Sequence, residues 1–206
     1  MKDTVFSGSL RVAKKRLRLP PSVVALAALC TLLGFAGDAG RQLGRYERAA
    51  LEAGEYWRLL TAHVVHLGWG HLWPNVLALL ILGVLFEDVL RPRHWLAAVL
   101  VSSIAIDAGL YFLDPSVAWY VGLSGVLHGI MAAGAVMLML RGETFGAVLA
   151  IGFCGKLIYE QMFGPLPFTA ESTGGPVITA AHLYGAAGGF SVSIVRYFFG
   201  ARRSRL

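Results

Sequence analysis

Six stretches of mostly apolar residues alternate with polar and charged segments along the chain. They cover residues 20–37, 75–89, 95–113, 122–140, 145–163 and 177–199. Most of them are close to the roughly 20 residues that a helix needs to cross the hydrocarbon core of a bilayer. Because that core offers no partners to backbone polar groups, spanning segments of this kind are helical. The pattern predicts an all-α polytopic membrane protein with a six-transmembrane-helix bundle.

Composition agrees with this pattern. Of the 206 residues, 56% are hydrophobic and 15% are charged, which excludes a soluble domain of ordinary surface composition. No repeat or flexible linker interrupts the chain. We therefore expect one helical domain over residues 20–200, preceded by a basic segment of residues 1–19 and followed by a basic tail of residues 201–206.

The positions of lysine and arginine predict the orientation in the membrane. Cytoplasmic loops are enriched in these residues, so both termini and the loops after the second and fourth stretches are expected in the cytoplasm. Segments 38–74, 114–121 and 164–176 then face outward. Topology accounts for most of the net charge of +6, so membrane lipid is the expected partner and nucleic acid is not. The residues concerned are Lys2, Arg11, Lys14, Lys15, Arg16, Arg18, Arg91, Arg93, Arg141, Arg196, Arg202, Arg203 and Arg205.

Two further features of the sequence have simple interpretations. The first apolar stretch follows a basic leader, as in a signal peptide, but its removal would leave an odd number of spans, so we expect it to be retained. The outward segment 38–74 mixes opposite charges with leucines and aromatic residues, which favours short amphipathic helices at the membrane interface. Cys30 and Cys154 lie within predicted spans and are expected to be buried small residues without a disulfide.

A serine and a histidine stand in two separate apolar stretches. Ser124 lies in the string Gly122-Leu123-Ser124-Gly125 at the start of the fourth stretch, and His182 lies in the sixth. Polar groups inside hydrocarbon are costly and are therefore functional candidates. A hydroxyl beside an imidazole forms an activated nucleophile and its base. The pair predicts an intramembrane serine hydrolase, with Ser124 as nucleophile and His182 as general base.

Small residues give these two stretches faces for close contact. Gly185 and Gly189 follow the histidine, and Gly125 and Gly129 follow the serine, each pair at the small-xxx-small spacing of packed membrane helices. If the two faces meet, the serine hydroxyl and an imidazole nitrogen can approach to hydrogen-bond distance, about 3 Å.

Hydrogen-bond donors for an oxyanion stand at the start of the second stretch, in His66-(x4)-His71-(x3)-Asn75. His71 and Asn75 are four residues apart, so on a helix they project from one face, and both can donate. Donors fixed in a poorly solvated site stabilise a developing oxyanion. His66 cannot share that face and is expected to hold the loop.

These motifs resemble, in order and spacing, those of the rhomboid intramembrane proteases. The resemblance implies an all-helical bundle whose shorter central helices leave a water-filled cavity open to the outside. Trp57 and Arg58 would belong to a structural loop that dips into the outer leaflet. The motifs are Trp57-Arg58, His66-(x4)-His71-(x3)-Asn75, Gly122-Leu123-Ser124-Gly125 and His182-x-x-Gly185-(x3)-Gly189.

The resemblance also implies a role for each site residue. Ser124 and His182 would form a two-member catalytic dyad. His71, Asn75 and the backbone N–H of Ser124 would form the oxyanion hole. No cofactor is expected.

One position departs from the common rhomboid pattern. Four residues after Ser124, where many rhomboids carry a tyrosine that packs on the catalytic histidine, this chain has His128. Without a third carboxylate, His182 would be oriented by packing against His128.

His128, the short length and the minimal helix plan look like rhombosortase, a bacterial subfamily. That resemblance implies a bacterial inner membrane protein whose site opens outward. Its substrates would be exported proteins anchored by a C-terminal Gly-Gly motif, an apolar helix and a basic tail.

Several alternatives stay beside this interpretation. His63, His66 and His71 could together bind zinc, although the His-Glu-x-x-His pattern of membrane metalloproteases is absent, and His128 with His182 could ligate haem. A noncatalytic rhomboid-like protein that binds transmembrane helices is a third alternative. Water or an amine could resolve the acyl-enzyme.

Charged residues inside the predicted spans need interpretations of their own. Asp107 is expected to have a structural hydrogen-bonding role. Lys156 and Glu160, four residues apart near the outer end of the fifth stretch, are expected to form a local ion pair or interface anchors.

Overall fold

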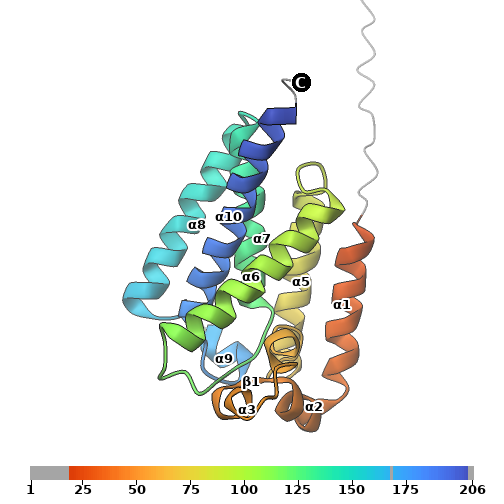
Figure 1. Ribbon diagram of the computed structural model, residues 1–206, viewed down its shortest axis with the longest axis vertical. Helices are drawn as coiled ribbons and strands as arrows, with labels where there is room; N and C mark the ends of the chain where they lie inside the picture. Colours follow the sequence, from red (N-terminus) through yellow and green to blue (C-terminus); the bar gives the residue numbers. More distant parts are fainter. Residues whose placement is uncertain (1–18, 168, 204–206) are drawn as a thin grey trace, which may run out of the picture.

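The computed structural model describes residues 19–167 and 169–203, and within them long helices form the body of the molecule (Figure 1). Each predicted apolar stretch coincides with one long helix, which confirms the all-α fold. The helices are α1 (Pro21–Gly34), α5 (Trp69–Leu85), α6 (Pro92–Phe112), α7 (Ser124–Leu140), α8 (Thr144–Phe163) and α10 (Thr179–Arg203). The basic residues at positions 1–18 and 204–206 lie outside the described residues.

The long helices differ in their ability to cross a membrane. Among the described residues, α6 is long and apolar enough on its own, and α1 passes together with α2 (Gly37–Gly44), to which it is joined at a bend of 115°. Helices α5 and α7 are apolar but have 17 residues each. A helix of that length covers about 26 Å, less than the roughly 30 Å of a hydrocarbon core. Six membrane crossings therefore remain a prediction.

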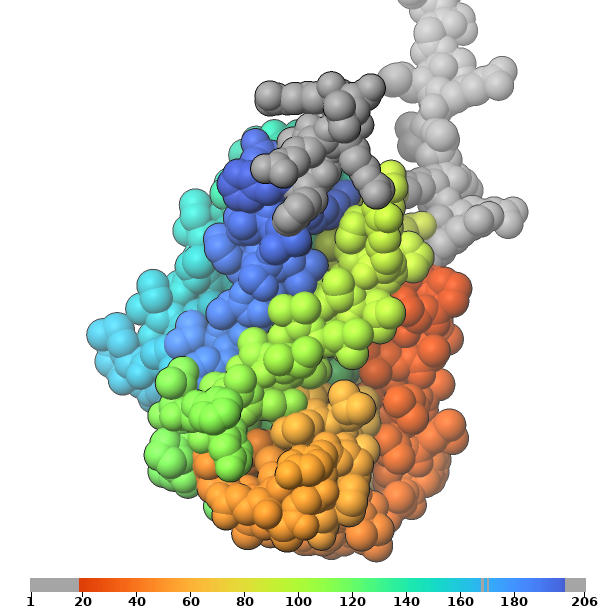
Figure 2. Space-filling view, in the orientation of Figure 1, coloured from red at the N-terminus to blue at the C-terminus, as the bar shows by residue number. Residues whose placement is uncertain are grey.

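Short elements gather at one end of the bundle, the end opposite the C-terminus (Figure 1). Residues 38–68 form short helices, as their mixed pattern predicts, whereas residues 69–74 of the expected outward segment are the start of α5. Figure 2 shows the short helices covering that end of the molecule. Strands β1 and β2 pair antiparallel, with Tyr46 opposite Tyr120 and Glu47 opposite Trp119. This pairing ties the outer segment to the residues just before α7. The short elements are α2, β1 (Tyr46–Glu47), α3 (Arg48–Glu52), α4 (Arg58–Thr61), β2 (Trp119–Tyr120) and α9 (Thr169–Thr173).

Helix α7 forms the centre of the bundle and contacts α5, α6, α8 and α10. Most of its side chains are buried, and several are glycine or alanine. Small residues let neighbouring backbones approach closely, which in a membrane replaces the hydrophobic effect as a source of helix association. The central helix thus gives the residue at its start, Ser124, a rigid support.

The contact between α7 and α10 depends on two glycine pairs. A Cβ atom on Gly185 would collide with the carbonyl oxygen of Gly125, and one on Gly189 would collide with that of Gly129. The two small faces expected from the sequence therefore lie against each other, backbone to backbone.

Helix α8 is the most exposed of the long helices. Its residues are all described, and Gly146 and Glu160 are the two that are buried. Cys154 on this helix is exposed, contrary to the expectation, whereas Cys30 on α1 is buried; both are free thiols. The expectation was wrong for Cys154 because α8 turns most of its surface away from the bundle.

Candidate active site

Ser124 is the first residue of α7 and follows a tight turn. Gly122 in that turn has φ +117°, a conformation that side chains disfavour. The N–H of Gly122 donates to the carbonyl of Ala62 at 2.8 Å, and the Tyr120 hydroxyl donates to the carbonyl of Gly122 at 2.8 Å. Since the first N–H groups of a helix have no acceptor within it, the Ser124 N–H is left available for an anion.

His182 on α10 lies against this serine. Its Nε2 is 3.0 Å from the Ser124 Oγ, and its side chain is buried. Ala181, just before it, sits where its carbonyl oxygen would contact a Cβ on Gly125. The glycine contact between the helices and the serine–histidine contact are thus parts of one packing arrangement.

The predicted oxyanion donors lie on the other side of the serine turn. His71 and Asn75 are buried on α5, and the His71 ring rests on Gly122, where a Cβ would come within 2.9 Å of Nε2. The backbone N–H of Leu67 donates to His71 Nδ1 at 3.4 Å, which leaves the ring proton on Nε2, facing the turn. The Asn75 amide donates to the His71 carbonyl at 2.8 Å.

His66 supports the His71 ring, and does not join the oxyanion donors. The two imidazoles meet edge to face, with centroids 5.1 Å apart. Burial, followed by the nearby His71, lowers the pKa of His66 to about 3, so its ring is neutral. The loop-holding role expected from the sequence stays a prediction.

His128 stacks on His182, as its place one turn after the serine suggested. The ring centroids are 4.0 Å apart and the planes differ by 7°. His128 Nδ1 is 2.7 Å from the carbonyl oxygen of Ser124, and because a carbonyl only accepts, Nδ1 carries the proton. Its Nε2 is then an acceptor, 2.7 Å from the Lys156 ammonium.

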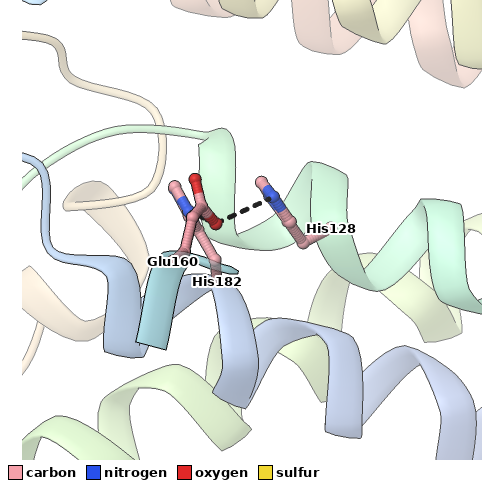
Figure 3. Close-up of side chains that lie close together, drawn as sticks. All are labelled: His128, Glu160 and His182. Carbon is pink, nitrogen blue, oxygen red and sulfur yellow. Dashed lines mark hydrogen bonds and ion pairs between the residues drawn. The ribbon is translucent and has the colours of Figure 1, made fainter. Parts of the chain in front are cut away.

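The sequence interpretation missed a carboxylate at this site. Glu160 Oε2 lies 2.9 Å from His182 Nδ1 and 2.7 Å from Lys156 Nζ. The expected local ion pair is present, but its carboxylate also contacts the histidine, so the expectation that His182 has no carboxylate beside it was wrong. Figure 3 shows Glu160, His128 and His182 converging from α8, α7 and α10. Position along the helices was the signal: each of the three residues lies within about two turns of the helix end that faces the short elements.

These three residues are also a candidate metal cluster, since their ligand atoms lie within 4.8 Å of one another. The geometry favours a different interpretation. The two imidazole rings are stacked, so their lone pairs lie in parallel planes and do not converge on one ion. The Lys156 ammonium also occupies the space beside Glu160 and His128 that a metal ion would need. His63, another histidine of the zinc alternative, lies 3.3 Å from Asp107 Oδ1, and the structural role expected for Asp107 stays a prediction.

A cavity of about 570 Å³ opens in front of the serine–histidine pair. Its walls come from α5, α7, α8, α9, α10 and the segment before α7. The candidate residues that line it are His71, Asn75, Ser124, His128, Lys156, Glu160 and His182. The site can therefore receive an extended peptide beside a buried nucleophile, base and hydrogen-bond donors.

Residues 53–198 match the Rhomboid domain, a region that includes every residue of this site. The chain belongs to the rhomboid family. The rhomboid protease homologue YdcA of Bacillus subtilis (strain 168) is 29% identical over 143 residues, or 69% of this chain and 68% of YdcA. Rhomboid protease GluP of the same organism is 26% identical over 147 residues, or 71% of this chain and 27% of GluP. The chain is an intramembrane serine protease.

The first rhomboid motif, Trp57-Arg58, lies in the outer segment. Arg58 is buried, and its guanidinium donates to the carbonyls of Gln42 at 2.8 Å and Arg45 at 2.9 Å and pairs with Glu55 at 2.6 Å. Trp57 is exposed, and its indole N–H donates to a backbone carbonyl at 3.2 Å. In this rhomboid, the arginine holds the segment together, and the tryptophan ring lies on the surface of the protein.

Proposed function

We propose that this rhomboid protease cuts a transmembrane segment of its substrate near the outer face of the membrane, with Ser124 as nucleophile and His182 as general base. The contact of 3.0 Å between Ser124 Oγ and His182 Nε2 carries the proposal. It is within the range expected for a nucleophile and its base.

The proton path follows from this contact. Ser124 Oγ attacks the scissile carbonyl carbon while its proton moves to His182 Nε2. The peptide C–N bond then breaks, and His182 returns the proton to the leaving amine. Water attacks the acyl-enzyme with the same base, and Ser124 is released.

The oxyanion of the tetrahedral intermediate needs donors at the turn before α7. The Ser124 N–H, at the start of the helix, and His71 Nε2, on Gly122, lie at this turn. Asn75, one helical turn further along α5, would join them when its amide swings from the His71 carbonyl into the cavity. Each such donor lowers the activation barrier by on the order of 3 kcal/mol.

Hydrolysis needs water at the depth of Ser124. Helix α7 has 17 residues and is shorter than a bilayer core, so on this proposal its first residue, Ser124, lies within the membrane rather than at its surface. The cavity in front of it, with several polar walls, admits the second reactant. We place the opening on the outer side of a bacterial inner membrane, with both termini in the cytoplasm, from the distribution of lysine and arginine.

For the substrate, we propose exported proteins with a C-terminal sorting signal: a Gly-Gly motif, an apolar helix and a basic tail. His128, stacked on His182, supports this choice as the residue shared with the rhombosortase pattern. Glycines favour an unwound substrate segment, and only an extended peptide can present its carbonyl to Ser124. An amine acceptor in place of water would transfer the cleaved protein to that amine.

The test is cleavage in proteoliposomes of a reporter that carries such a signal. Ser124→Ala and His182→Ala should each lower turnover by at least about 10³-fold. The matched controls, Ser191→Ala on α10 and His94→Ala near the start of α6, should cleave normally. Labelling by a fluorophosphonate probe should need both Ser124 and His182. Full cleavage by folded Ser124→Ala protein would contradict the proposed nucleophile.

The substrate class has its own test. Replacing Gly-Gly of the reporter by Leu-Leu, with the apolar helix and basic tail kept, should lower cleavage by at least tenfold. Equal cleavage of both reporters would contradict the sorting-signal substrate and leave the catalytic assignment intact.

A further inference from the structure

Glu160 is an unusual residue to find buried on α8. The helix exposes most of its surface, yet this carboxylate side chain is 2% exposed. A buried charge is costly unless it is paired and hydrogen-bonded, and charged residues inside membranes are rare. Packing alone therefore does not explain why the Glu160 carboxylate is buried.

The contacts of Glu160 fix the proton positions of the catalytic histidine. An ionised carboxylate only accepts hydrogen bonds, so His182 Nδ1, 2.9 Å from Glu160 Oε2, must carry the ring proton. The lone pair is then on Nε2, the atom that faces Ser124 Oγ at 3.0 Å. With the opposite tautomer, Nε2 could not take the serine proton.

We propose that Glu160 is the positioning residue of a Ser124–His182–Glu160 triad, in place of the two-member dyad. It selects the reactive tautomer of His182 and stabilises the imidazolium that forms when Ser124 attacks. This inference rests on the proposed function, because it assigns a role to Glu160 only through His182.

Lys156 completes the arrangement. Its ammonium lies 2.7 Å from the same Glu160 oxygen, one helical turn away, and keeps the buried carboxylate ionised when His182 is neutral. It also donates to His128 Nε2 at 2.7 Å. His128 is thereby held over the His182 ring, with its own proton on the Ser124 carbonyl. Each hydrogen bond in this cluster then has one donor and one acceptor.

The experiment compares three variants in the proteoliposome assay, with kcat and KM measured separately. Glu160→Gln keeps the shape and one acceptor oxygen but removes the charge. We expect its kcat to fall between about 10²- and 10⁴-fold, the upper figure being that known for the equivalent change in a serine-protease triad, with KM within twofold. The matched control is Glu143→Gln, an exposed glutamate just before α8, which should retain normal kcat.

The third variant separates a positioning role from a structural one. Glu160→Asp restores the charge but changes the shape, so it should have a higher kcat than Glu160→Gln. A purely structural role predicts the reverse order, because glutamine is the closer match in size. A kcat for Glu160→Gln within tenfold of the wild type, or an aspartate variant no better than glutamine, would overturn the triad.

Parallel assays of Ser124→Ala and His182→Ala keep this result distinct from the proposed function. If both are inactive while Glu160→Gln is active, the dyad stands and the triad fails. If both are active, the proposed function itself fails. Thermal unfolding in detergent shows that each variant is folded.

Discussion

Helix α10 is held against α7 and against α8 by different means. Toward α7 it packs backbone against backbone, with Gly185 on Gly125 and Gly189 on Gly129. Toward α8 it is held by polar side chains: His182 contacts Glu160 at 2.9 Å, and the Gln161 amide donates to the Thr179 carbonyl at 3.1 Å. The first contact leaves no room for adjustment, whereas the second consists of bonds that reorient.

The two contacts set different properties of the same histidine. Glycine packing fixes the distance between His182 and Ser124, because the backbones that carry them cannot separate or rotate without losing contact. The polar contact fixes the proton and charge of the imidazole. Distance and protonation are thus controlled by separate parts of the fold, and substitutions can change one without the other.

Among substitutions outside the Ser124–His182–Glu160 cluster, the largest effect is expected from breaking the glycine contact. In Gly189→Val, the added side chain meets the carbonyl oxygen of Gly129, so α10 must move away from α7. Overpacking lowers stability by about 1–3 kcal/mol or more, and a shift of about 1 Å at the site lowers turnover about 10²-fold. Thermal unfolding and cleavage rates measure both.

Gly155→Val on α8 is the matched control, because nothing lies within 4 Å of a Cβ there. It should leave stability and turnover close to the wild type. Wild-type activity in Gly189→Val would contradict the view that glycine packing sets the catalytic distance.

A similar fall in turnover, with less overpacking between helices, is expected at the turn before the nucleophile. Gly122→Ala forces a side chain into φ +117° and against the His71 ring, whereas Gly54→Ala has φ +95° with nothing within 4 Å. Both variants carry backbone strain of about 1–3 kcal/mol. Only Gly122→Ala should also lower kcat, by about 10²-fold, through loss of an oxyanion donor. Equal kcat in the two variants would contradict the assignment of His71 to the oxyanion hole.

A variant at His128 tests whether the stacked ring also orients His182. His128→Ala removes the stacking on His182 and should lower kcat about tenfold, equivalent to about 1.4 kcal/mol, without unfolding the protein. His128→Phe retains an aromatic ring and should recover part of that loss. Unchanged turnover in the alanine variant would show that Glu160 alone orients the histidine.

The smallest effect is expected on stability, at the ion pair between Arg45 and Glu47, which lies outside the active site. The Arg45 guanidinium, hydrogen-bonded to Glu47, lowers the pKa of that carboxyl, with a smaller contribution from Arg58. A carboxyl with a lowered folded-state pKa stabilises the fold above its ordinary pKa and loses that contribution as pH falls. For a side chain one third exposed, we expect less than about 1 kcal/mol.

Unfolding measured between pH 7 and pH 3 tests this expectation for Glu47. In Glu47→Gln, the fall in stability below about pH 4.3 should be shallower than in the wild type. Identical pH dependence in the two proteins would mean that the Arg45 contact contributes nothing to stability.

Local sequence patterns were sufficient to predict part of this molecule. Apolar stretches predicted the long helices, and glycine spacing predicted which faces of α7 and α10 meet. Ser124 and His182 could be paired because each is a rare polar residue beside such a face. These inferences need only periodicity and the cost of polar groups in hydrocarbon.

Other features depend on tertiary structure that no local pattern encodes. Glu160 looks like half of an i, i+4 ion pair with Lys156, and only the rotation of α8 about its axis turns it toward His182. The pairing of β1 with β2 involves two residues on each strand, too few for an alternating pattern. The sharp bend between α1 and α2 likewise involves a single residue with positive φ, Gly37 at φ +58°, which no periodic pattern predicts.

The order of the site residues along the chain has a consequence for biosynthesis. His182 follows Ser124 by 58 residues and lies on α10, the last helix described. A nascent chain presents its serine to the membrane well before its histidine leaves the ribosome. On the proposed mechanism, the protease stays inactive while it is inserted, and its proteolytic activity begins when α10 docks against α7.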